Sequence, residues 1–245
     1  MVSGLVFLVG GVIMFALTLV DDTQILGIDR WIKPMKFYFS VGIFLWTVAF
    51  YLDYLRDQKR FSSIVSWSMI LIFVVELAAV TGQAMRGTTS HFNIATRVDA
   101  ITFAVMGVAI VINTLLVAAI LFKYMRVETG LPASVLWGMR LGLILFLAGS
   151  IQGGYMSAQF GHTVGAADGG PGLPLTNWST VAGDLRVAHF LGLHSLQVIP
   201  LVAVILQRFE VSNSKVLTIG FAAAYFLVFM LLFVQALRGL PLISL

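Results

Sequence analysis

Seven nearly uncharged runs of at least 18 residues dominate this chain of 245 residues. A helix needs about 20 mainly apolar residues to cross the roughly 30 Å hydrocarbon core of a bilayer. None of the runs shows the alternating pattern of a membrane β-barrel. We therefore predict an all-α fold: a polytopic membrane helix bundle with seven transmembrane helices, forming one domain over residues 1–245. The predicted spans are 3–20, 37–54, 64–83, 100–122, 134–160, 187–207 and 216–237.

The composition agrees with a protein that lies in a lipid bilayer. Hydrophobic residues make up 59% of the chain and charged residues 11%. The charged residues are too few to cover the surface of a soluble globule. The net charge of +4 is small and the cations form no cluster, which argues against nucleic acid as a partner. Cysteine is absent, which excludes disulfides, thiolate metal sites and c-type haem attachment. The predicted partner is the lipid bilayer, and the predicted location is the cell's inner (plasma) membrane.

The loops predict an orientation for the chain. The short connections after the second, fourth and sixth spans, with the start of the fifth span, carry eight Lys and Arg residues, against seven on the other side. By the positive-inside rule this margin predicts a cytoplasmic N-terminus. The long loops at 21–36, 84–99 and 161–186 then lie on the extracytoplasmic side. All four histidines lie in or near these loops, so we expect the chemistry at that side.

Glu76 lies near the middle of the third span, where an ionised carboxylate costs at least a few kcal/mol. It must therefore be protonated or partnered. One interpretation is an interhelical hydrogen bond with Asn113 of the fourth span. The other is a catalytic role in proton relay, or a role in ligand binding. Gln83 follows Glu76 by seven residues on the same helix face, which leads outward to Arg86 and His91.

The fifth span carries a polar stripe that would face a cavity, a cofactor or another helix. If the helix continues past Gly161, three- and four-residue spacings align Gln152, Tyr155 or Met156, Gln159 and His162. Plain helix packing is the alternative, because Gly149, Gly153 and Gly154 allow a neighbouring helix to come close.

In the sixth span, His189 and His194 are five residues apart and point about 140° away from each other. Unlike a pair four residues apart, they cannot both bind one small metal ion. At most one of them is expected to share a site with His162. We favour His189, which lies nearer the predicted outer face.

Residues 159–197 contain the segments QFGHTVG, GGPG, GDLR and AHFLGLH. This stretch resembles the haem A synthase family, in which histidines on paired helices near the outer face bind haem. The resemblance implies that His162 is one axial iron ligand, that His189 or His194 is the other, and that Arg186 lies near a propionate. That family has eight spans in two similar halves. Here RGTTSHF at 86–92 faintly echoes RVAHF at 186–190, but the first half lacks a second histidine, so the resemblance extends to a single haem.

The residues also suit haem b on chemical grounds. Haem b is a flat apolar disc whose iron takes a neutral imidazole nitrogen and whose propionates need cations at the aqueous edge. Arg86 and Arg186 are such cations, and oxygens of Gln159, Asp184 or Ser90 could orient an imidazole. The predicted function is a haem-b-binding oxidoreductase or electron carrier. Its partner would be quinone or a redox protein. A homo-oligomer is the alternative to a monomer.

Two other functions compete with haem binding. The first is a transporter or receptor for a small anionic or polar ligand, suggested by the cationic loops, by Glu76 and by the glycines of the fifth and sixth spans. The second is a zinc hydrolase in which histidines such as His162 and His189, with Asp184, would bind zinc and activate water. The seventh span contains no lysine deep in the membrane, which argues against a retinal Schiff base.

Overall fold

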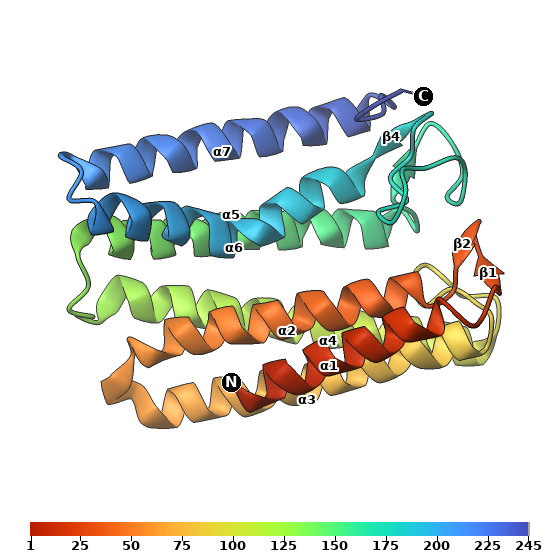
Figure 1. Cartoon of the computed structure of the whole chain (residues 1–245), viewed down its shortest axis with the longest axis horizontal. Helices are drawn as coiled ribbons and strands as arrows, with labels where there is room; N and C mark the ends of the chain where they lie inside the picture. The colour runs from red at the N-terminus through yellow and green to blue at the C-terminus, as the bar shows by residue number, and fades with distance from the viewer. Residues whose placement is uncertain (245) are drawn as a thin grey trace. The chain divides into compact units, whose positions relative to one another are not determined.

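The computed structural model describes residues 1–244, apart from the side chain of Arg56. Helices make up almost all of its regular structure, and two short β-hairpins complete it (Figure 1). The elements are α1 (Val2–Leu17), β1 (Gln24–Ile25), β2 (Ile28–Asp29), α2 (Ile32–Asp53), the 3-10 helix η1 (Arg56–Gln58), α3 (Lys59–Met85), α4 (Arg97–Arg126), α5 (Ala133–Ala158), β3 (Thr163–Val164), β4 (Gly183–Asp184), α6 (Leu185–Arg208) and α7 (Ser214–Leu237).

Within the described residues, six helices, α2 to α7, are long and apolar enough to cross a membrane. They correspond to the second to seventh predicted spans, so the prediction of a multi-pass helical membrane protein is confirmed. The helix α1 is shorter than its predicted span, with 16 residues that extend about 24 Å. The chain groups into two compact units, which are described separately below.

Unit 1 comprises residues 1–50, 58–113 and 168–177. In it, α1 packs against α2 where small residues let the backbones approach. A Cβ on Gly4 would lie 3.0 Å from the carbonyl oxygen of Gly42, and the indole of Trp46 donates a hydrogen bond to the carbonyl of Met1 at 2.9 Å. The helix α3 contributes one buried face, in which residues recur every three or four positions: Val65, Met69, Ile72, Phe73, Glu76, Leu77, Val80, Gln83 and Ala84.

Unit 2 comprises residues 51–57, 114–167 and 178–245, and contains α5, α6 and α7 (Figure 1). Glycines bring α5 and α6 together. A Cβ on Gly142 would lie 2.8 Å from the carbonyl oxygen of Ser195, and one on Gly149 would lie 2.9 Å from the Cα of Gly192. Helix packing is thus confirmed as a role of Gly149, whereas no atom lies within 4 Å of a Cβ on Gly154.

A left-handed residue ends α5. Phe160 has φ 55°, its amide donates to the carbonyl of Ser157, and the amide of Gly161 donates to the carbonyl of Met156. These two bonds form a Schellman motif, which closes a helix C-terminus. The chain then enters β3, which pairs antiparallel with β4 and faces Thr163 with Asp184. The hairpin therefore brings His162 to the start of α6.

Candidate functional site

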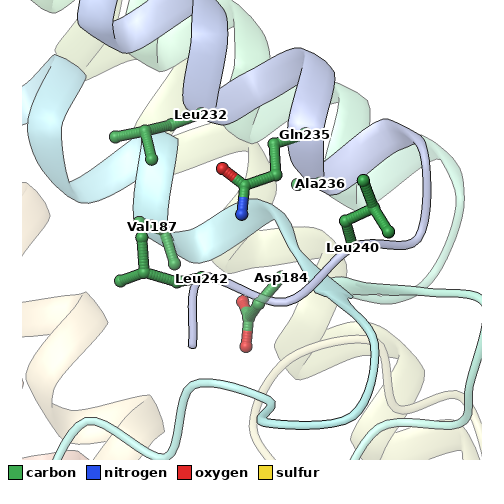
Figure 2. Close-up of a pocket in the computed structure, with 7 residues that line it drawn as sticks. All are labelled: Asp184, Val187, Leu232, Gln235, Ala236, Leu240 and Leu242. Carbon is green, nitrogen blue, oxygen red and sulfur yellow. The ribbon is translucent and has the colours of Figure 1, made fainter. Parts of the chain in front are cut away.

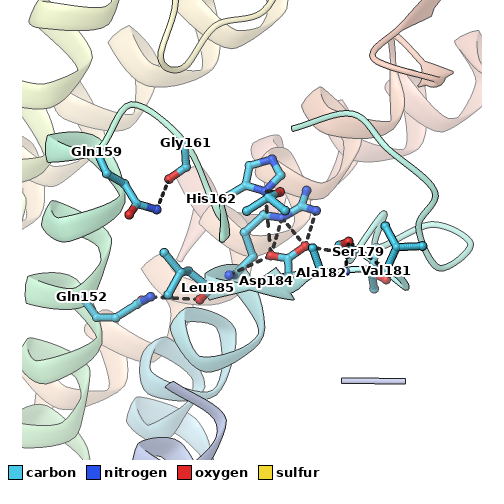
Figure 3. A network of polar contacts seen from close by, with 12 residues as sticks. Gln152, Gln159, Gly161, His162, Ser179, Val181, Ala182, Asp184 and Leu185 are labelled. Atoms are coloured by element: carbon cyan, nitrogen blue, oxygen red, sulfur yellow. Dashed lines mark hydrogen bonds and ion pairs between the residues drawn. The ribbon is translucent and has the colours of Figure 1, made fainter. Parts of the chain in front are cut away.

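Asp184 is the centre of the polar network in unit 2 (Figure 3). It is the N-cap residue of α6 and is 2% exposed. Its carboxylate accepts hydrogen bonds from the backbone amides of Arg186 at 3.0 Å and Ser179 at 2.8 Å. The Arg186 side chain adds Nε to Oδ1 at 2.9 Å and Nη2 to Oδ2 at 2.6 Å. An acidic side chain is favoured here because it satisfies free amides and lies at the positive end of the helix dipole.

The environment of Asp184 keeps its carboxylate ionised. Burial alone would raise the pKa of Asp184, but the hydrogen bonds and charge of Arg186 and the amide of Ser179 outweigh it. The pKa of Asp184 is therefore lowered from its ordinary value. The network thus holds a fixed negative charge beside the first turn of α6.

His162 lies next to this charge. Its Nδ1 is 3.9 Å from Asp184 Oδ1, beyond hydrogen-bond distance, and 3.2 Å from the hydroxyl of Thr163. The carbonyl of His162 accepts the amide of Leu185 at 2.9 Å. The side chain of Gln152 in α5 donates to the carbonyl of Leu185 at 3.0 Å, and its Oε1 is buried without a hydrogen-bond partner. Backbone and side-chain bonds therefore join the end of α5 to the start of α6.

The predicted polar stripe does not reach His162 along a continuous helix. The helix α5 ends at Ala158, so His162 lies in the following segment, where the pairing of β3 with β4 brings it beside Asp184. Gln159 is exposed and donates a hydrogen bond to the carbonyl of Gly161 at 3.0 Å. It therefore stabilises the turn and does not bond to an imidazole.

His189 lies against the glycines of α5. Its Nδ1 is 2.9 Å from the carbonyl oxygen of Gly149, and because a carbonyl can only accept, Nδ1 carries the proton. In the neutral imidazole this leaves the lone pair on Nε2, the arrangement seen in metal-binding histidines. A Cβ on Gly153 would lie 2.5 Å from His189 Cε1, so only glycine leaves space for this ring.

The other two histidines have aromatic neighbours. His194 lies against Phe190, with ring centroids 4.1 Å apart. In unit 1, His91 lies among Phe37, Phe92 and Phe103, with centroids 5.5 to 6.5 Å away. Among residues 1–244, no three His, Cys, Asp or Glu side chains are grouped so that they could bind a metal ion. The zinc hydrolase therefore has no three-ligand centre in this part of the chain.

The predicted hydrogen bond between Glu76 and Asn113 does not form through Glu76 Oε1 or Asn113 Oδ1. Glu76 Oε1 and Asn113 Oδ1 are both buried without a hydrogen-bond partner. The register explains this. Gln83 of α3 donates to Asp99 of α4 at 2.8 Å, so in two antiparallel helices Glu76 lies opposite residue 106. Asn113 is seven residues further along, or about 10 Å.

Arg86 belongs to the same end of α3 as Gln83. It donates hydrogen bonds to the side chains of Gln83 and Asp99, the latter at 2.7 Å, and Thr96 donates to Asp99 at 2.6 Å. The Arg86 side chain is 44% exposed, whereas that of Asp99 is 4% exposed. Arg86 thus neutralises a buried carboxylate at the edge of unit 1.

A chain of hydrogen-bonded side chains in unit 2 was not predicted from the sequence. The guanidinium of Arg140 donates to the carbonyl of Tyr124 at 2.7 and 3.0 Å, and the Tyr124 hydroxyl donates to the carbonyl of Tyr51 at 2.7 Å. The Tyr51 hydroxyl donates to the carbonyl of Leu196 at 3.0 Å. Pro200 was the available signal: it has no N–H to bond the carbonyl four residues before it, so Leu196 needs another donor.

A small pocket of about 10 Å³ lies where α7 and the C-terminal segment meet the start of α6 (Figure 2). The side chains of Asp184 and Gln235 supply its polar groups, and Val187 and Leu240 are among its apolar walls. Its volume is below the roughly 300–1,000 Å³ of typical small-molecule sites. It is therefore too small for a haem.

Comparison with known proteins finds no matching family model, no similar curated protein and no similar solved structure.

Proposed function

We propose that the chain is a multi-pass membrane protein that binds haem b through His189 and serves as an electron carrier or oxidoreductase. The observation that carries this proposal is the hydrogen bond from His189 Nδ1 to the Gly149 carbonyl. It favours the tautomer in which Nε2 can bind iron. The absence of a Cβ on Gly153 supports the same role, because the imidazole of His189 packs in the room that this leaves and is restricted to one orientation.

His162 is the second histidine that we propose would hold the haem. Its backbone carbonyl bonds the amide of Leu185, one turn of α6 before His189. Asp184 and Thr163 lie beside its Nδ1, so they can orient the ring. A haem held by two histidines would supply electron transfer, with quinone or a redox protein as the partner. Haem bound here would supply a one-electron redox centre, and this chain's residues would hold and orient it.

Visible absorption tests this proposal. Protein purified from haem-replete cells should show a Soret band and, after reduction, an α-band. His189→Ala should abolish both bands, and His162→Ala should change the axial ligation. The matched control is His91→Ala in unit 1, which should leave the spectrum unchanged. A wild-type protein without a Soret band would refute haem binding.

Transport of a small anionic or polar ligand is the second candidate function, favoured by the buried, unpartnered oxygen of Glu76. It differs from the first in its response to mutation. A transporter stays colourless and loses uptake on Glu76→Gln, whereas a haem protein keeps its spectrum in that variant. Retained uptake in Glu76→Gln counts against this candidate.

We also propose that α1 is a seventh span, with the N-terminus in the cytoplasm and the loop before α6 outside. Because the chain has no cysteine, single cysteines report accessibility without a background. In intact cells, a membrane-impermeant maleimide should label Ala166→Cys but neither Glu128→Cys nor Ser3→Cys. Labelling of Ser3→Cys together with Ala166→Cys would show that α1 does not cross the membrane. Labelling of Glu128→Cys alone would reverse the orientation.

A further inference from the structure

Glu76 lies in the buried face of α3. The buried residues before and after it, at three- and four-residue spacing, continue this face over most of the helix. Glu76 itself is 2% exposed. Its carboxyl group is therefore shielded from lipid headgroups and bulk water.

In the described part of unit 1, the middle of the helices offers no cation to this carboxyl group. The helical segments of unit 1 at 2–17, 37–50, 61–85 and 100–113 contain no Lys, Arg or His, and Glu76 is their only acidic residue. Tyr38 is the only other titratable side chain in these segments. The nearest charged groups along the α3 face are Arg86 and Asp99, which pair with each other.

No hydrogen bond compensates for the missing cation at Oε1, which is buried without a partner. An ionised carboxylate in this position would cost at least several kcal/mol. A carboxylic acid costs much less, because it carries no net charge. We propose that Glu76 is a proton-binding site, a buried carboxyl group that holds a proton in the folded membrane protein. This proposal does not depend on haem binding in unit 2.

The proton would come from the end of α3 that carries Gln83. This residue shares the helix face of Glu76 and lies about 10 Å from it along the axis. It bonds both Arg86 and Asp99, and the side chain of Arg86 reaches the surface. Val80, one turn after Glu76, is 1% exposed and places an apolar side chain between Glu76 and Gln83. Exchange of the proton therefore requires local opening of this apolar segment.

Two measurements on the full chain in membranes test the proposal. Lipid-soluble dicyclohexylcarbodiimide adds to a protonated carboxyl group: the proton moves to a carbodiimide nitrogen, the carboxyl oxygen bonds the central carbon, and no group leaves. Peptide mass spectrometry should find the adduct on Glu76 and lose it in Glu76→Gln. Asp99 and Asp184 are matched controls, because they are buried carboxylates paired with arginine and should stay unlabelled.

Infrared spectroscopy reads the same group without a reagent. The carbonyl band of a protonated carboxylic acid should be present in the wild-type protein and absent in Glu76→Gln. The band supports the proposal, and so does an adduct that forms equally in sodium chloride and in choline chloride. Absence of both overturns it. An adduct that sodium chloride suppresses and choline chloride does not would also overturn it, because the site would then bind a metal cation.

Discussion

Replacing Tyr51 with phenylalanine should destabilise unit 2 because the carbonyl of Leu196 loses its donor. This carbonyl lies four residues before Pro200, which has no N–H, and the Tyr51 hydroxyl bonds it at 3.0 Å. Tyr51 is 1% exposed and Leu196 1% exposed, so the carbonyl has no route to bulk water. The substitution keeps the aromatic ring, which lies 5.7 Å from that of Tyr124.

The expected loss in the free energy of unfolding follows from the burial of Tyr51 and Leu196 and from the lost hydrogen bond. Leaving a buried acceptor unsatisfied costs about 1–3 kcal/mol, whereas hydrogen bonds between membrane helices average about 0.6 kcal/mol and reach about 1.7 kcal/mol. Because the helix offers no other amide, we expect Tyr51→Phe to cost about 1.5 kcal/mol. Tyr225→Phe is the matched control. Its hydroxyl bonds the carbonyl of Leu191 at 2.7 Å, and that carbonyl lies four residues before Ser195, which has an N–H. We expect a cost of about 0.5 kcal/mol there.

Equilibrium unfolding in mixed detergent micelles measures both costs, and Pro200→Ala completes a double-mutant cycle. Alanine supplies the amide that Pro200 lacks, so Tyr51→Phe should cost about 1 kcal/mol less in the Pro200→Ala background. The Tyr225→Phe cost should be the same in both backgrounds. If Tyr51→Phe costs the same with and without Pro200, the hydroxyl does not compensate for the proline and the reasoning is refuted.

Two further predictions concern packing and charge in unit 2. Gly149→Ala should lower the free energy of unfolding by about 1–3 kcal/mol, because its Cβ would lie 2.9 Å from the Cα of Gly192. Gly154→Ala, where no atom lies within 4 Å, should be neutral or slightly stabilising in the same unfolding assay. The lowered pKa of Asp184 stabilises the folded protein above the ordinary carboxyl pKa, and this stability is lost as the pH falls through the lower folded value. The unfolding temperature should therefore depend less on pH in Asp184→Asn than in the wild-type protein, between pH 7 and acid. An unchanged pH profile in Asp184→Asn would contradict this prediction. Equal effects of Gly149→Ala and Gly154→Ala would contradict the prediction on packing.

The helical part of the fold could be predicted because a membrane helix must satisfy its backbone hydrogen bonds internally. Apolar runs in the sequence therefore indicate where six of the long helices lie. The end of α5 could not be predicted in this way. The left-handed conformation falls on Phe160, a residue type that rarely adopts it, so the helix stops before the polar stripe reaches His162.

The candidate site was predictable in its residues and not in its contacts. Short motifs indicated Asp184, Arg186 and the histidines, and a mid-span acidic residue indicated Glu76. Which partners these residues have depends on helix register. One bond, from Gln83 to Asp99, shows that Glu76 and Asn113 are about 10 Å apart along the helices.

The sequence alone determined that this protein enters a membrane, because its long apolar runs can only be buried in lipid or against one another. It also determined that Glu76 is the one charged residue of the third predicted span, 64–83. Only the tertiary structure decided that Tyr51 bonds the Leu196 carbonyl, which Pro200 leaves without a backbone donor. It also decided that His189 fits over Gly153 and that Asp184, paired with Arg186, lies beside His162. The first two contacts join residues far apart in the chain, and their geometry depends on how closely the glycines of α5 let α6 approach.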